Sequence, residues 1–272
     1  MTGALEYMYS PAAGGLKLWV FRARTPEPSP AAVFYFGGAW AHGSPTQFAE
    51  QARYLASRGV TSVLVDYRVT RRHGSTVRDS LADAADAFAW VRSQAGQLNI
   101  DPARIAAAGG SAGGHLAAML AGLPDPARRP DALLLFNPVL LLATAHTGLA
   151  HLNPPTVIAS IEAWGLEAEE LSPYHLLGPH SPPTLIMHGR ADSVVPFAAS
   201  EAYVRRALAM GASPAVLVGF DEQDHGFFNV GRSGGWPFVA TMRRCDEFLA
   251  ELGWLEGPPT LRIAVDGELK ST

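Results

Sequence analysis

Cysteine is nearly absent from this chain of 272 residues: Cys245 is the one instance, so no disulfide can form within the chain. Basic residues are also few, with 21 Lys and Arg against 25 Asp and Glu and a formal net charge of −4. Since no Lys/Arg-rich run exists, the electrostatic footprint of a nucleic-acid-binding protein is missing. We therefore expect no nucleic-acid partner.

Long apolar runs are missing as well, and none reaches the roughly 18 residues that a membrane-spanning helix needs. The first six residues have neither a basic n-region nor an apolar h-region, so no signal peptide is visible. These absences predict a cytoplasmic protein with no membrane partner, although a cloned mature form of a secreted protein would look the same. No H-x-H or H-E-x-x-H pattern occurs either, so we expect neither a metal site nor a cofactor.

Apolar material is abundant, because 48% of the residues are hydrophobic and only 17% are charged. This balance supports a well-buried core and excludes a disordered or fibrous chain. Candidate strands lie at residues 5–9, 16–22, 32–36, 60–66, 104–109, 132–136, 184–188 and 215–220. Apolar spacing predicts helices at residues 47–57, 77–94, 112–121, 198–210 and 239–252. Such alternation implies parallel βαβ units, with helices on both faces of a sheet.

The alternation predicts a single α/β domain over residues 1–256. Its rhythm breaks between Pro138 and Pro182, where small and polar residues, several prolines and a candidate helix at residues 158–164 occur. We interpret this stretch, about residues 139–182, as a short cap-like insertion over an active site or as a long surface excursion. The C-terminal tail, residues 257–272, contains a candidate strand at residues 260–265, which either adds a strand or forms a homodimer contact.

The pattern G-x-S-x-G occurs at residues 109–113, after a predicted strand and before a predicted helix, with Ser111 as its serine. In this context the pattern is typical of a nucleophile elbow, a sharp turn that leaves no room for bulky neighbours. A glycine pair at residues 37–38 follows an earlier predicted strand. We predict an oxyanion hole formed by the N–H groups of Gly38, Ala39 and Ala112. The alternative interpretation of each motif is a tight turn that merely needs glycine.

A serine hydroxyl is a weak nucleophile and needs a nearby base, which in turn needs an orienting carboxylate. In this architecture the chain order is serine, acid, histidine. Asp192 and His225, one of nine histidines, follow two successive predicted strands and are the predicted acid and base. Asp221 and Asp224 are alternative acids, but both are so close to His225 in sequence that they would have to fold back on it. His188, at the end of a buried strand, is interpreted as structural.

With these residues assembled, the sequence resembles the α/β-hydrolase esterases related to hormone-sensitive lipase. Within that group it is most similar to bacterial acetyl-xylan-esterase-like and feruloyl-esterase-like proteins. The resemblance covers roughly residues 31–254 and rests on Phe36-Gly-Gly-Ala-Trp40, Gly43-Ser-Pro45, Val65-Asp-Tyr-Arg68, Asp101-Pro-Ala-Arg-Ile105, Gly109-Gly-Ser-Ala-Gly-Gly-His115, Phe136-Asn-Pro138, Pro183-Thr-Leu-Ile-Met-His-Gly189, Asp192 with Val195-Pro196, and His225-Gly-Phe-Phe-Asn229.

The resemblance implies an α/β-hydrolase fold with a mostly parallel sheet of about eight strands. It also implies a Ser111–Asp192–His225 triad beside the oxyanion hole named above. Two positions depart from the family pattern. Phe36 stands where the relatives usually have histidine, and Ala39 replaces their third glycine, which crowds the acyl pocket.

These residues predict a serine carboxylesterase that works through a covalent acyl-enzyme and removes acetyl or other short acyl groups from a small-molecule or carbohydrate ester. Candidate substrate-binding side chains are Trp40, Phe36, His115 and Phe227, whereas Phe228 and Trp236 are interpreted as core aromatics. Two alternatives stay open: an amidase or peptidase that uses the same triad, and a hydrolase-fold binding protein without catalysis.

Overall fold

The computed structural model describes residues 1–144, 148–156, 168–263 and 269–271. Eight strands form one sheet in the order β1-β2-β4-β3-β5-β6-β7-β8. Their bounds are β1 Leu5–Ser10, β2 Leu16–Phe21, β3 Ser29–Tyr35, β4 Thr61–Val65, β5 Ile100–Gly110, β6 Ala132–Phe136, β7 Thr184–Gly189 and β8 Ala215–Phe220. Strand β2 runs antiparallel to both of its neighbours, and all pairs from β4 to β8 are parallel. This sheet confirms the predicted fold class.

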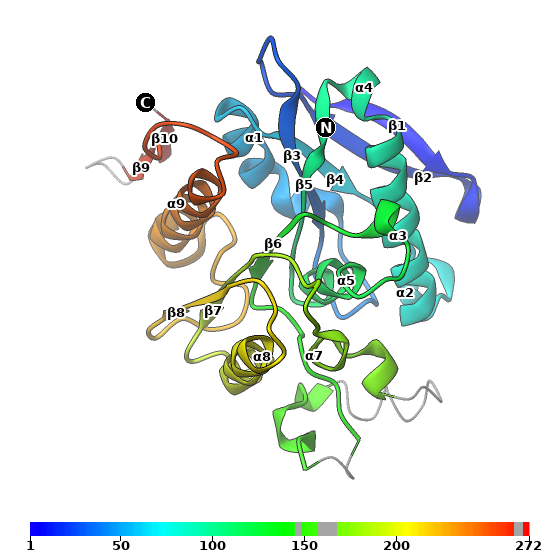
Figure 1. Cartoon of the computed structure of the whole chain (residues 1–272), viewed down its shortest axis with the longest axis vertical. Coiled ribbons are helices and arrows are strands. Elements are labelled where there is room, and N and C mark those ends of the chain that lie inside the picture. Colours follow the sequence, from blue (N-terminus) through cyan, green and yellow to red (C-terminus); the bar gives the residue numbers. More distant parts are fainter. Residues whose placement is uncertain (145–147, 157–167, 264–268, 272) are drawn as a thin grey trace.

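The central strands are mostly apolar and mostly buried because helices cover both faces of the sheet (Figure 1). Every residue of β3, β4, β6 and β7 is buried. Helices α3 (Val77–Ser93), α5 (Ala112–Leu120) and α8 (Phe197–Ala209) share one hydrophobic core with one face. Helices α1 (Ala49–Ser57) and α9 (Trp236–Glu251) share another core with the opposite face.

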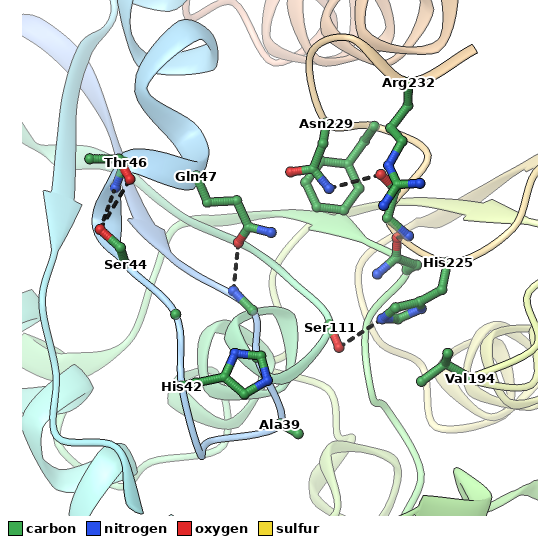
Figure 2. Close-up of a pocket in the computed structure, with 16 residues that line it drawn as sticks. Ala39, His42, Ser44, Thr46, Gln47, Ser111, Val194, His225, Asn229 and Arg232 are labelled. Carbon is green, nitrogen blue, oxygen red and sulfur yellow. Dashed lines mark hydrogen bonds between the residues drawn. The ribbon is translucent and has the colours of Figure 1, made fainter. Parts of the chain in front are cut away.

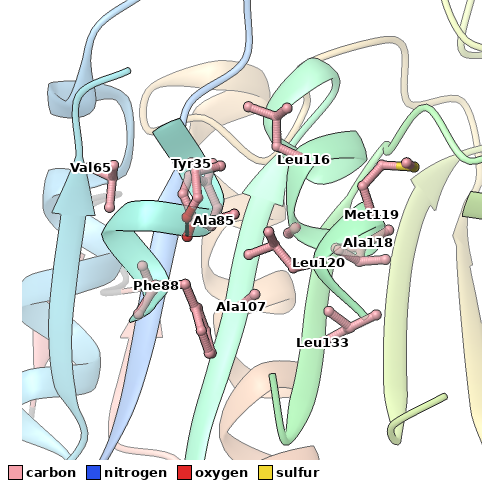
Figure 3. Close-up of a cluster of buried hydrophobic side chains, with 14 of the residues drawn as sticks. Tyr35, Val65, Ala85, Phe88, Ala107, Leu116, Ala118, Met119, Leu120 and Leu133 are labelled. Carbon is pink, nitrogen blue, oxygen red and sulfur yellow. Dashed lines mark hydrogen bonds between the residues drawn. The ribbon is translucent and has the colours of Figure 1, made fainter. Parts of the chain in front are cut away.

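Strand β5 carries short side chains where helices α3 and α5 meet over the sheet (Figure 3). Ala107 lies beneath Phe88 of α3 and Leu120 of α5, and all three are fully buried. The small residue leaves room for the larger ones, as close packing of a protein interior requires. Helix α5 is therefore held firmly against β5, and the turn that joins them is the one that contains Ser111.

The remaining described elements are short. They are α2 Thr70–His73, α4 Ala95–Leu98, α7 Pro173–Leu176, β9 Leu261–Ile263, β10 Leu269–Ser271, and 3₁₀ helices at Ala12–Gly14, Pro45–Phe48, Pro126–Arg128, Ala150–Leu152, Ala168–Leu171 and Arg232–Gly235. Helix α9 begins three residues before its predicted start because Pro237 fits the first turn of a helix, where its missing N–H costs nothing. In the described part of the chain, no helix is both long and apolar enough to cross a membrane.

The predicted insertion and tail are partly described. The predicted helix at residues 158–164 lies outside the described residues. Elsewhere in the insertion, Leu141, Ala143 and Leu152 form a small core with Ala199 and Ala202 of α8. In the tail, β9 and β10 pair antiparallel in a two-stranded sheet of their own rather than extending the main one.

Candidate active site

The turn between β5 and α5 holds Ser111 in a strained backbone conformation, with φ 55° and ψ −121°. Close backbone contacts require glycine at the first and last positions of the G-x-S-x-G pattern. A Cβ atom on Gly113 would lie 2.0 Å from the carbonyl oxygen of Tyr35, and one on Gly109 would lie 2.5 Å from the backbone of Gly113. Larger residues at either position would push the strand, the turn and the helix apart. The G-x-S-x-G pattern is therefore explained by packing around Ser111.

The three predicted triad side chains meet at the carboxyl edge of the parallel strands. Nε2 of His225 lies 3.0 Å from Oγ of Ser111 (Figure 2), and Nδ1 lies 2.8 Å from Oδ2 of Asp192. Since a carboxylate oxygen only accepts, Nδ1 carries the ring hydrogen and Nε2 presents its lone pair to the serine hydroxyl. The Asp192 side chain is 0% exposed and that of His225 is 19% exposed.

The Asp192 carboxylate is satisfied by four donors. Oδ1 accepts the N–H groups of Val194 (2.9 Å) and Val195 (2.8 Å), and Oδ2 accepts from His225 and also from Nε2 of His188 (3.1 Å). Burial by itself raises the pKa of this carboxyl group, but the hydrogen bonds from His188 and His225 outweigh burial and hold the pKa well below its usual range.

The two alternative acids are engaged elsewhere. Oδ1 of Asp224 accepts from the N–H and hydroxyl groups of Ser193 and from the backbone N–H of His225, rather than from its ring. Asp221 pairs with Arg190 at 3.0 Å. The structure therefore brings Asp192 to the imidazole, and neither Asp221 nor Asp224.

The predicted oxyanion loop follows β3 and has an unusual backbone. Gly38 has φ 131°, and Ala39 and Trp40 have φ 53° and 55°. A Cβ atom on Gly38 would lie 2.1 Å from the carbonyl oxygen of His42, so no other residue fits there. Within the described residues, the N–H groups of Gly38 and Ala39 donate to no protein group, and both residues line the same cavity as Ser111. Ala112, the third predicted donor, is the first residue of α5.

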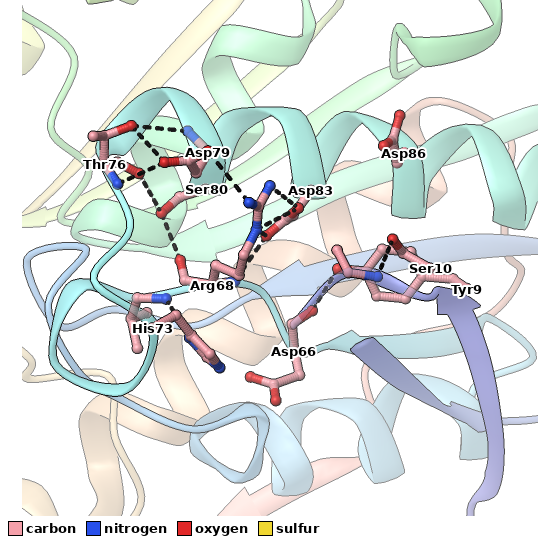
Figure 4. Close-up of polar contacts among 12 residues, drawn as sticks. Tyr9, Ser10, Asp66, Arg68, His73, Thr76, Asp79, Ser80, Asp83 and Asp86 are labelled. Atoms are coloured by element: carbon pink, nitrogen blue, oxygen red, sulfur yellow. Dashed lines mark hydrogen bonds and ion pairs between the residues drawn. The ribbon is translucent and has the colours of Figure 1, made fainter. Parts of the chain in front are cut away.

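Neighbouring segments hold this loop in place. Oε1 of Gln47 accepts the N–H of Gly37 at 2.7 Å, and the hydroxyl of Tyr67 donates to the carbonyl of Phe36 at 2.6 Å. The segment that carries Tyr67 is itself tied to α3, because Arg68 pairs with Asp83 at 2.8 Å (Figure 4). The predicted oxyanion loop is thus held in one conformation by its neighbours, as a preorganised site would require.

A cavity of about 500 Å³ opens over Ser111 (Figure 2). Its lining residues are Gly37, Gly38, Ala39, His42, Gly43, Ser44, Thr46, Gln47, Ser111, Asn137, Val194, His225, Gly226, Phe228, Asn229 and Arg232. No described residue of the insertion at 139–182 is among them, and none of the lining residues carries a carboxylate. Most of the side chains that line it are polar.

Several lining residues were not predicted from the sequence, namely Gln47, Asn137, Asn229 and Arg232. Asn137 directly follows β6, and its Oδ1 accepts the N–H of Gly226 at 3.0 Å, which ties the end of β6 to the loop that carries His225. Its place at the carboxyl end of a parallel strand was the signal that could have identified it. Gln47 and Arg232 lie in short 3₁₀ helices and Asn229 lies in a bend, and none of these segments carries such a signal.

The expected substrate-binding side chains do not line the cavity, and this expectation is corrected. Trp40, Phe36, His115 and Phe227 are all buried. Each ring packs into the core instead: Trp40 lies edge-on to His115 with centroids 5.0 Å apart, Phe36 stacks on Tyr67 at 4.1 Å, and Phe227 packs on Phe220 at 4.9 Å. Phe228, interpreted as core, is buried but does line the cavity. The same interpretation of Trp236 is wrong, because this residue is 40% exposed and lies outside the cavity. Among the described residues, no three His, Cys, Asp or Glu side chains are grouped as metal ligands would be.

The sheet order, the strained serine turn and the cavity above it define an α/β-hydrolase. A family model described as BD-FAE matches residues 20–131. Esterase LipU of Mycobacterium tuberculosis is 30% identical over 241 residues, which cover 81% of this chain and 77% of LipU. Esterase LipC of the same organism is 29% identical over 231 residues, or 78% of this chain, and the chain spans only 56% of LipC.

The solved structures that resemble this chain include esterases as well. Esterase 2 of the planctomycete Thermogutta terrifontis, solved with propionate bound, is 38% identical with a TM-score of 0.85, and the match covers 94% of this chain and 97% of that one. The chain belongs to the α/β-hydrolase esterases related to hormone-sensitive lipase.

Proposed function

We propose that this protein hydrolyses carboxylic esters through an acyl-enzyme formed on Ser111. The observation that carries the proposal is the continuous hydrogen-bond chain from Asp192 through His225 to the Ser111 hydroxyl, with separations of 2.8 and 3.0 Å. Such a chain supplies the base that a serine needs and holds that base in the correct tautomer. Membership of an esterase family supports ester hydrolysis as the chemistry.

In this mechanism Ser111 Oγ attacks the ester carbonyl while its proton passes to Nε2 of His225. The N–H groups of Gly38, Ala39 and Ala112 receive the developing oxyanion, and one such donor is worth on the order of 3 kcal/mol in the transition state. His225 then protonates the leaving alcohol, and the C–O bond of the ester breaks. A water molecule gives a proton to His225 and attacks the acyl carbonyl. His225 then passes this proton to Oγ of Ser111 as the bond between Oγ and the acyl carbon breaks, which releases the acid and restores Ser111. Asp192 stabilises the imidazolium in both halves of the reaction.

The cavity favours an ester substrate with a short acyl group and a polar alcohol part, and a carbohydrate is an alcohol of this kind. Ser44, Thr46 and Gln47 supply hydrogen-bonding groups on one side of Ser111, and Asn229 and Arg232 supply them on the other (Figure 2). The methyl group of Ala39, where the relatives carry glycine, takes up space beside the nucleophile and disfavours bulky acyl groups. The propionate complex of the Thermogutta terrifontis esterase supports a preference for short acids.

Hydrolysis of peptides on the same triad is the less favoured function. A peptidase that recognises a free substrate amine needs a carboxylate near the scissile bond, and the cavity lining contains none. A binding protein without catalysis would have no need to keep all three side chains in hydrogen-bond contact. Both observations favour the esterase.

The test is hydrolysis of 4-nitrophenyl acetate, butyrate and octanoate beside acetate release from acetylated xylo-oligosaccharides. We expect rates to fall with acyl length, and acetate release would place a carbohydrate at the alcohol side. Ser111→Ala should lose turnover, whereas Ser193→Ala, whose hydroxyl bonds Asp224 rather than the triad, should stay near the wild-type rate. Turnover retained by Ser111→Ala would overturn the proposal.

A further inference from the structure

A second imidazole contacts the Asp192 carboxylate. His188 is the penultimate residue of β7, and its side chain is fully buried. Nε2 of His188 lies 3.1 Å from Oδ2 of Asp192, the same oxygen that His225 contacts at 2.8 Å. On the other side of the ring, Nδ1 lies 2.8 Å from the hydroxyl of Ser200, a buried residue of α8. A chain of hydrogen bonds therefore runs from Ser200 to Ser111 with Asp192 at its centre.

The surroundings fix the tautomer of His188. Nε2 faces the Asp192 carboxylate and also the carbonyl oxygen of Val195 at 3.1 Å. Neither oxygen can donate, so Nε2 carries the ring hydrogen and shares it between them. In this tautomer Nδ1 accepts the hydroxyl hydrogen of Ser200. The opposite tautomer would place a lone pair against the carboxylate and leave Nδ1–H facing Ser200.

We propose that His188 is a positioning residue for the triad, which fixes the Asp192 carboxylate and limits how strongly that carboxylate stabilises the protonated form of His225. The inference deepens the proposed function and rests on it for its catalytic meaning. Oδ2 accepts two N–H donors at once, so its negative charge stabilises each of them less than it would stabilise a single donor. The buried hydrogen-bond network also leaves the carboxylate a single orientation, since both its oxygens are occupied.

Other charged groups near this network are either paired or directed elsewhere. Arg190 lies over the ring of Phe197, whose edge packs on His188 with centroids 5.5 Å apart, and Arg190 also pairs with Asp221. Asp224 bonds backbone and hydroxyl groups of the adjoining loops. Arg232 also lines the cavity and is exposed. Among the described residues, Asp192 is thus the one carboxylate that bonds His188.

The first test compares His188→Leu, which removes the donor, with His188→Gln, which keeps an amide donor near the position of Nε2. For 4-nitrophenyl acetate we expect His188→Leu to lower kcat on the order of 10- to 100-fold, by analogy with the loss of hydrogen-bond partners that orient metal-binding residues, with little change in KM. The acid limb of kcat/KM should move to higher pH by up to about one unit, the equivalent of one charge-assisted hydrogen bond. His188→Gln should restore most of kcat and most of the wild-type position of the acid limb. Ser200→Ala should shift the acid limb in the same direction as His188→Leu, but by less.

His115 offers a matched control, because it is another fully buried histidine whose Nε2 bonds a backbone carbonyl, that of Leu171, and not the triad. His115→Leu should lower stability and leave the acid limb in place. An unmoved acid limb in His188→Leu, with loss of stability alone, would reduce His188 to a structural residue.

A second readout does not depend on turnover. NMR titration of the His225 ring should give a higher pKa in His188→Leu than in the parent, and the ¹⁵N shifts of His188 should show the Nε2–H tautomer, weakened in Ser200→Ala. If the wild type cleaves no ester while the His225 titration moves as expected, the esterase proposal fails and the role of His188 stands. An unchanged His225 titration would overturn the role of His188 whatever the activity. Should His188→Leu fail to fold, Ser200→Ala decides by the same two measurements.

Discussion

Acid should destabilise this protein through His115, and the size of the effect follows from the structure. The imidazole is 0% exposed, its Nε2 bonds the Leu171 carbonyl at 2.7 Å, and Nδ1 has no hydrogen-bond partner within the described residues. Protonation would therefore bury a charge with one unsatisfied N–H. Burial lowers the pKa of His115 from 6.5 to about 4, and the bond to Leu171 offsets only part of that effect.

The sign follows from proton binding in the two states. Between pH 6.5 and about 4 the unfolded chain holds this proton and the folded protein does not, so stability falls as the pH falls. One pKa unit corresponds to about 1.4 kcal/mol, so the whole transition costs about 3 kcal/mol, of which about 2 kcal/mol is lost between pH 7 and pH 4.5.

The assay is urea unfolding of the wild type and His115→Gln from pH 4.5 to pH 7.5. Gln keeps a donor for the Leu171 carbonyl but does not titrate, so the stability gap between the two proteins should change by about 2 kcal/mol across this range. Other groups with lowered pKa values, such as Asp192 and His175, are present in both proteins and cancel. His151→Gln, which removes an exposed histidine, should keep the wild-type slope. Parallel stability curves for the wild type and His115→Gln would refute the reasoning.

Three further changes test the site. Asp192→Asn should keep the fold but lower kcat by about 10⁴-fold, because an amide favours the wrong His225 tautomer; steady-state kinetics and circular dichroism check this. Ala39→Gly should raise the ratio of butyrate to acetate ester hydrolysis by up to about 10-fold, since one methylene decides such ratios; an unchanged ratio would mean that Ala39 does not limit acyl length. Tyr67→Phe removes the hydroxyl bound to the Phe36 carbonyl and should cost about 1 kcal/mol of stability, as measured by thermal unfolding. In steady-state kinetics it should lower kcat and have a smaller effect on KM.

The sequence alone determined the α/β architecture, because its signals are local. Strands β6 and β8 have the predicted bounds, 132–136 and 215–220, since short apolar runs between turn residues identify buried strands. Ser111 was identifiable because its glycines form one short motif of the chain, although the contact that requires Gly113 is with Tyr35 at the end of another strand, β3. Chain order and strand ends were then enough to select Asp192 and His225 as partners that the fold does bring together.

Only the tertiary structure decided which side chains face the cavity and which face the core. The four expected substrate-binding side chains lie next to the motifs in sequence, yet their rings pack inward against other rings. Phe36 packs on Tyr67, Phe227 packs on Phe220, and Trp40 and His115 pack on one another. The side chains that do line the cavity come from loops and short 3₁₀ helices far apart in the chain, whose sequences carry no periodicity that would place them. Nothing in the sequence indicated that His188 contacts Asp192, and its position in a buried strand indicated a structural residue. Whether its ring reaches the carboxylate depends on how the loop after β7 folds back.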